Sequence, residues 1–96
     1  MLTGKQKRFL RSKAHHIQPI FQVGKGGVNS NLVKQVDEAL EARELIKVSV
    51  LQNCEDDKDT VASQLSSGSK AELVQVIGST IVLYKESINQ KRIQLP

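Results

Sequence analysis

The segment Gly24-Lys25-Gly26-Gly27 has residue types that suit close contact with a phosphate group. Glycine has no Cβ and tolerates positive φ, so the main chain can approach an anion closely, and Lys25 supplies a mobile cation. The segment lies between an apolar run at 20–23 and a helix-like pattern starting at Asn29 or Ser30, whose free N–H groups would add to the site. No Gly-Lys-Ser/Thr occurs, and the dinucleotide-binding pattern would need glycine in place of Asn29. The spacing fits the Gly-x-x-Gly clamp of KH-type modules, which holds a nucleic-acid backbone. A plain tight turn is the alternative.

The charged residues are distributed unevenly along the chain. All ten acidic residues lie at Asp37 or later, whereas seven of the 14 basic residues lie before it. These seven are Lys5, Lys7, Arg8, Arg11, Lys13, Lys25 and Lys34. A basic end on a mildly acidic body indicates a polyanionic partner. The alternative is a solvated, lysine-rich helix that binds nothing.

The two histidines do not form a recognisable catalytic or metal site. His15 and His16 are adjacent, so on a helix their side chains point about 100° apart, and no third or fourth ligand is evident. We expect His15 to face phosphate as a donor, and His16 to be a hydrogen-bonding residue either at the edge of the core or at the helix end. The acidic run at 55–59 lacks the spacing of a calcium loop and suits the start of a helix. We expect no catalysis, no cofactor and no metal.

Few residues could stack on nucleic-acid bases. Phe9, Phe21 and Tyr84 are the only aromatic residues, too few for a base-stacking platform. Binding would therefore depend on phosphate contacts and on salt concentration. The single cysteine, Cys54, cannot form an internal disulfide, and no apolar run reaches the roughly 18 residues of a membrane span. With no signal-peptide pattern at the start, we expect a cytoplasmic monomer that does not contact membranes.

Seven elements should position these residues. Thr3 and Gln6 have the spacing of a capping box, which predicts a helix ending before Pro19, with Lys7, Arg8, Arg11 and His15 on its outer face. A short buried strand at 20–23, a helix from Asn29 or Ser30, a strand at 45–51 and a short helix ending near Gly68 should follow. Two strands, at 73–77 and 80–84, are joined by Gly78-Ser79 in a hairpin.

This order predicts a two-layer α/β domain over a mixed four-stranded sheet. The first two strands bracket a helix and should be parallel, with a right-handed crossover. We expect one domain at 1–85 and a polar, frayed extension at 86–96. The basic helix should lie beside the glycine loop, so that both form one surface.

Several motifs together resemble a known family. They are Leu10-Arg11, Ala14-His15-His16-Ile17, Pro19, Val23-Gly24-Lys25-Gly26-Gly27, Glu44-Leu45-Ile46-Lys47-Val48, Leu73-Val74-Gln75-Val76-Ile77-Gly78 and Val82-Leu83-Tyr84-Lys85. Over residues 2 to 85 the chain resembles the CRM-domain family in its stand-alone bacterial, YhbY-like form. The family often has a His before the Glu-Leu-Ile-Lys-Val strand, where this chain has Arg43.

The resemblance implies a fold like the C-terminal domain of the third translation initiation factor, and it implies RNA binding. Bacterial single-domain members are associated with precursors of the large ribosomal subunit and plant relatives with group II intron splicing, so the implied role is ribosome assembly. The family's loop maps onto 24–27 and its basic helix face onto residues around Lys7, Arg8, Arg11 and His15.

Three alternatives stay open from the sequence. A general RNA chaperone or splicing-type binder would use the same surface. A phosphate-dependent enzyme would use Lys25 with His15 or His16. A protein-interaction module would dock an acidic partner through the first helix.

Overall fold

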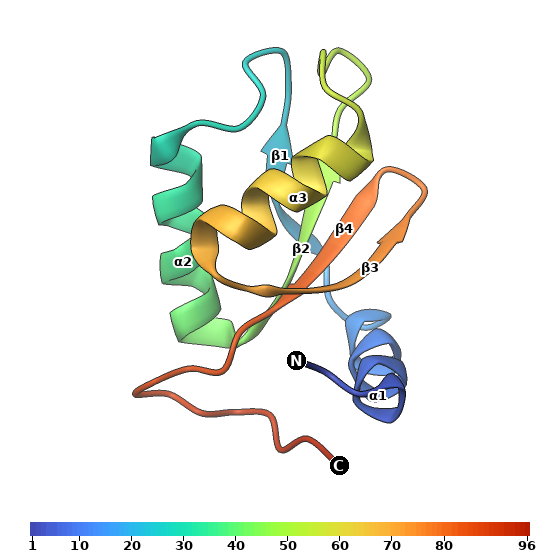
Figure 1. The fold of residues 1–96 in the computed structure, drawn as a ribbon, viewed down its shortest axis with the longest axis vertical. Helices are drawn as coiled ribbons and strands as arrows, with labels where there is room; N and C mark the ends of the chain where they lie inside the picture. Colours follow the sequence, from blue (N-terminus) through green and yellow to red (C-terminus); the bar gives the residue numbers. More distant parts are fainter.

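The computed structural model describes all residues 1–96 and has the predicted order of elements (Figure 1). In chain order they are α1 (Gly4–Ala14), β1 (Pro19–Val23), α2 (Ser30–Arg43), β2 (Leu45–Val50), α3 (Lys58–Ser69), β3 (Glu72–Ile77) and β4 (Thr80–Tyr84). None of the helices is both long and apolar enough to cross a bilayer.

Side-chain caps fix where the helices begin. The Thr3 hydroxyl accepts from the Gln6 N–H at 3.1 Å, and the Gln6 side chain accepts from the Thr3 N–H at 3.0 Å, so the predicted capping box is confirmed. Asn29 caps α2 by accepting from Leu32 N–H at 2.8 Å. Asp57 caps α3 in the same way, and the N–H of Thr60 lowers the pKa of its carboxyl.

The sheet is mixed and four-stranded, as predicted, and its strand order is β1-β2-β4-β3. β1 and β2 are parallel, and both β2·β4 and β3·β4 are antiparallel. The prediction that β1 is a buried strand is wrong. It forms one edge of the sheet, so only Val23 is buried and Ile20 is 38% exposed.

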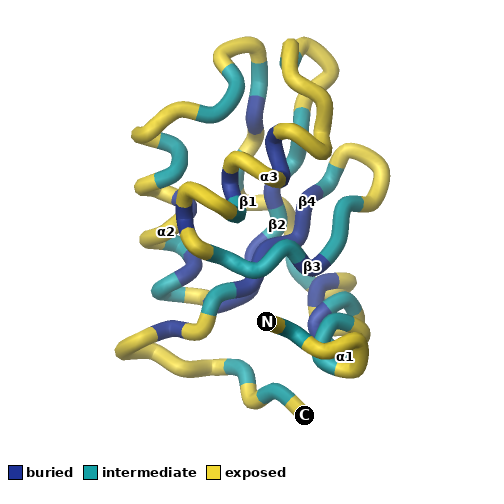
Figure 2. Tube along the Cα trace, in the orientation of Figure 1, coloured by how far each residue is buried: buried dark blue, intermediate teal, exposed yellow.

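Helices cover both faces of the sheet because successive strand residues point to opposite faces. On one face, α2 and α3 pack against Ile46 and Val48 of β2 and Ile81 and Leu83 of β4, which makes the two-layer body. On the other face, α1 packs against a second cluster that is built from Leu10, Ala14, Leu45, Val74, Val82 and Tyr84. Figure 2 shows these buried positions along the strands and the inner sides of the helices.

The third helix ends at Ser69, close to the predicted end near Gly68, with Lys70 in the left-handed conformation as its cap. A Cβ built at Gly68 would lie 3.0 Å from a Val33 methyl carbon of α2. Gly68 therefore serves close packing between α2 and α3 and does not break the helix.

The C-terminal segment differs from the expected frayed extension, because two carboxylates of α2 and its cap hold it. Glu44 is fully buried. Its carboxylate accepts hydrogen bonds from the N–H group of Ser87 at 2.8 Å, from that of Ile93 at 2.7 Å, and from that of Arg92. Glu41 accepts from the Ser87 hydroxyl and, at 2.9 Å, from the N–H groups of Ile88 and Asn89. The polar tail gave no periodic signal because main-chain donors attach it, together with the two separate apolar residues Ile93 and Leu95. The predicted domain boundary at residue 85 stays a prediction.

Candidate nucleic-acid interface

The outer face of α1 is a row of cations without acidic partners. Packing of Leu10 and Ala14 against the sheet turns the remaining faces outward. The exposed basic residues of this segment are Lys5, Arg8, Lys13 and His15, and the half-buried ones are Lys7 and Arg11. The protein contains two ion pairs, Lys85–Asp37 and Lys91–Glu86, so none of the α1 cations is paired. Their full charge is available to an external anion.

The glycine loop forms a tight turn at the start of α2. Gly27 N–H donates to the Gly24 carbonyl at 3.0 Å, and Gly27 has φ +65°. A Cβ built at Gly26 would have no neighbour within 4 Å, and Lys25 is exposed. The first turn of α2 contains no acidic residue, and its first N–H groups have no acceptor within the helix. Open main chain and an exposed lysine therefore lie in the loop, and the helix N-terminus follows it after Val28 and the cap residue Asn29.

The predicted adjacency of the basic helix and the glycine loop is wrong. In Figure 1 α1 and the loop lie toward opposite ends of the molecule, whose longest dimension is 37 Å. The reason is that β1 lies between them. After α1 the chain enters β1 at Pro19 and runs about 16 Å along the edge of the sheet before the loop begins. The two candidate surfaces are separate and are joined by an exposed edge strand.

The neighbour of the glycine loop is the acidic connection between β2 and α3. A Cβ on Gly27 would lie 3.0 Å from the Asp56 carboxylate, and one on Gly24 would lie 3.4 Å from the Asn53 side chain. The sequence contained the signal for this contact. Since β1 and β2 were predicted to be parallel, the connections that follow them must meet at the same edge of the sheet. An anion bound at the loop would feel the negative charge of Asp56.

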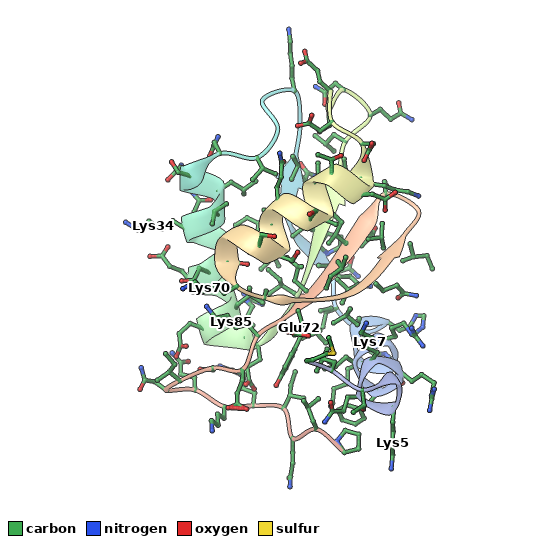
Figure 3. All side chains as sticks on the ribbon, in the orientation of Figure 1. Lys5, Lys7, Lys34, Lys70, Glu72 and Lys85 are labelled. Atoms are coloured by element: carbon green, nitrogen blue, oxygen red, sulfur yellow. The ribbon has the colours of Figure 1, made fainter.

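Lys34 lies on a third surface, the groove between α2 and α3. Lys70 and Lys85 line the same shallow hollow, and Figure 3 shows these three lysines on the side of the molecule away from Lys5 and Lys7. Lys85 is engaged, since its ammonium donates to Asp37 at 2.7 Å and to the Ser69 carbonyl at 2.9 Å. Lys34 and Lys70 are exposed and unpaired.

The two histidines separate at the end of α1. His15 is the C-cap residue and is exposed, next to the cationic face. His16 is also exposed and points to a hollow between α1 and β1. No group of three or more His, Cys, Asp or Glu side chains is placed to hold a metal ion.

The fold and these surfaces define a small α/β domain with a cationic helix on one face of a mixed sheet and a glycine loop at the far end of its edge strand. The family model of the CRS1 / YhbY (CRM) domain matches residues 2–85, and the chain belongs to this family. The resemblance drawn from the sequence is therefore confirmed.

Relatives of similar size extend the match. The chain is 75% identical to "Probable RNA-binding protein YqeI" of Bacillus subtilis, and the match covers the whole length of both chains. It is 37% identical to an "RNA-binding protein" of Haemophilus influenzae, covering 99% of this chain and 95% of that one. The solution structure of the hypothetical protein SAV1595 from Staphylococcus aureus matches along the full length of both chains, with 64% identity and a TM-score of 0.82.

Proposed function

We propose that this protein binds RNA through the phosphate backbone and assists assembly of the large ribosomal subunit. The observation that carries the proposal is the α1 face, whose basic side chains have no carboxylate partner anywhere in the molecule. Phosphate contacts of this kind supply most of the affinity of proteins that read little sequence. The names of the bacterial relatives support the choice of RNA.

Two separate contact areas would hold the RNA. The α1 area comprises Lys5, Lys7, Arg8, Arg11 and His15, and the loop area comprises Gly24–Gly27. Lys34 would add a further contact from the groove between α2 and α3. The separation of the two areas along β1 suits a structured RNA, since double-stranded RNA is recognised by shape through backbone contacts at successive grooves. A single phosphate could not touch both areas.

The partner we propose is ribosomal RNA of large-subunit precursors, bound by a cytoplasmic monomer without catalysis. This choice follows from what the family resemblance implies for bacterial single-domain members. A general RNA chaperone or splicing-type binder would use the same surfaces, and identification of co-purified cellular RNA would separate these roles.

Binding to structured ribosomal RNA across a salt series tests the surfaces. Each lost phosphate contact should flatten the plot of log K against log salt by about 0.7–0.9, so we expect that change for Arg11→Ala and for Lys25→Ala. Lys91→Ala removes a cation that is already paired with Glu86 at 3.3 Å and should leave the slope close to that of the wild type. Equal slopes for all four proteins would contradict the assignment of both areas.

A further inference from the structure

An open hollow of about 580 Å³ lies where the end of α1, the start of β1, the end of α2 and the C-terminal segment meet. Its apolar lining comprises Ile17, Ile20, Leu45, Ile46 and Ile93. The volume falls within the range of small-molecule sites, which are mostly apolar with a few polar groups that orient the ligand.

The strand register creates the hollow. Pairing between β1 and β2 starts with Pro19 opposite Lys47, so Leu45 and Ile46 have no partner residue in β1. Leu45 and Ile46 are themselves 7% and 1% exposed and lie beneath the floor, whose accessible apolar surface comes from Ile17, Ile20 and Ile93. The far wall is the C-terminal segment, whose Arg92 and Ile93 N–H groups are fixed on the buried Glu44 carboxylate. The hollow is therefore held open by the fold.

The rim is cationic. Three cations, Lys13, Arg43 and Arg92, line the hollow together with His16, and no Asp or Glu does. Arg92 donates through Nε to the Ala42 carbonyl at 2.8 Å, which fixes its guanidinium at the wall. Lys13 lies with its ammonium 5.2 Å from the centre of the Phe9 ring. None of the four has an ion-pair partner, so the rim would attract an anionic group beside an apolar body.

We infer that this hollow binds one unpaired nucleotide of the RNA, with the base against the isoleucine floor and its phosphate at the Lys13–Arg43 rim. A nucleotide combines a flat, largely apolar base with an adjacent anion, which matches the floor and the rim. The hollow also begins at the end of α1, where the cationic face ends, so a nucleotide displaced from a backbone held by α1 could reach it. The inference deepens the proposed function and rests on it.

The test compares two RNA hairpins that differ only in one bulged nucleotide, the fluorescent base 2-aminopurine. Wild type should bind the bulged hairpin about fivefold to tenfold more tightly than the paired one, the effect of one good contact. The fluorescence should rise on binding, because the base leaves its stacked neighbours and the hollow contains no Phe, Tyr or Trp. Ile20→Ser and Arg43→Ala should lose the preference and the fluorescence rise, and Ile20→Ser should bind the paired hairpin as wild type does.

Matched controls exist within the sheet and the tail. Ile77→Ser changes another exposed isoleucine, 56% exposed against 38% for Ile20, on the opposite edge strand, and Lys91→Ala removes a cation outside the hollow. Both should keep the preference. Equal binding of the two hairpins by wild type, or equal losses in Ile20→Ser and Ile77→Ser, would overturn the pocket while leaving backbone binding intact.

Two further outcomes distinguish failure of the proposed RNA binding from failure of the nucleotide pocket. Binding of neither hairpin at low salt would refute the proposed function and the pocket with it. Adenosine monophosphate alone should shift the amide resonances of Ile20 and Ile93 only at millimolar concentration; saturation at micromolar concentration would overturn the assignment to RNA and indicate a free nucleotide.

Discussion

Gly26 and Gly27 are neighbours in the loop, yet an added methyl group would meet different surroundings at each. At Gly27 the φ of +65° is unfavourable for any other residue, and the Asp56 carboxylate lies 3.0 Å from the position of a Cβ. At Gly26 the same atom would enter open space. One glycine is required by the fold, and the other leaves room beside the main chain.

This difference predicts opposite results for two single-methyl changes. Gly27→Ala should lower the free energy of unfolding by about 1–2 kcal/mol, the cost of a left-handed L-residue. Gly26→Ala should leave it unchanged within about 0.5 kcal/mol but weaken RNA binding, because the methyl group would occupy the space of the proposed phosphate. Urea unfolding and an RNA titration measure the two effects, and unchanged affinity for Gly26→Ala would contradict close approach at the loop.

The negative charge of Asp56 leads to a second prediction about a single residue. Since its carboxylate lies beside the glycine loop, it should repel a bound phosphate, and Asp56→Asn should tighten RNA binding by about twofold to fivefold at low salt. The gain should fade at high salt, where exposed charges are screened. Glu86→Gln is the control, because its charge is distant from the loop and already paired with Lys91. An equal gain in Glu86→Gln would indicate a general effect of net charge.

Among the elements, the C-terminal segment is held by two acids, of which only Glu44 is fully buried. Burial raises the pKa of Glu44, but the N–H groups of Ser87, Arg92 and Ile93 outweigh that effect and hold the pKa below its ordinary value of 4.5. A carboxyl whose pKa is lower in the folded than in the unfolded protein stabilises the fold above its unfolded pKa. That stability is lost as the pH falls below about 4.5 and through the folded pKa.

Substitution of the two acids of this region should therefore have unequal effects. Glu44→Gln should cost about 2 kcal/mol at neutral pH, because buried N–H groups lose a charged acceptor, and the variant should lose less stability than wild type between pH 5 and pH 3, roughly the range in which carboxylates titrate. Glu41→Gln should cost less, since Glu41 is only half-buried. Thermal unfolding across pH measures both, and an unchanged acid slope in Glu44→Gln would show that other groups dominate.

For the whole molecule, the sequence predicted more of the fold than of the surface. Cap residues, the apolar strands and the Gly78-Ser79 hairpin are local signals, and they placed all seven elements and the mixed sheet. Three features depend on long-range geometry and were missed: the exposed edge position of β1, the separation of α1 from the glycine loop, and the attachment of the tail to Glu44. Lys34 shows the same limit, because its neighbours Lys70 and Lys85 come from distant parts of the chain.

Truncation tests whether the chain is independent of its last residues, as the predicted domain at 1–85 requires. Deletion of 86–96 removes all three donors to Glu44 and the apolar contacts of Ile93 and Leu95 with the α1 cluster. We expect a loss of about 2 kcal/mol or more. Deletion of 94–96 keeps the three donors and should cost much less. Equal stability of the chain ending at Lys85 and the full chain would show that the boundary at 85 is correct and the tail dispensable.

The order of the sheet has a consequence for how copies of the protein meet in solution. Both outer strands interrupt their own ladders, β1 between Pro19 and Phe21 and β3 between Leu73 and Gln75. β1 also starts with Pro19, which offers no N–H to a further strand. Irregular edge strands, and a proline in an edge strand, discourage the edge-to-edge pairing of sheets that leads to aggregation. We expect these interruptions of the hydrogen-bonding pattern to limit strand pairing between copies at high concentration.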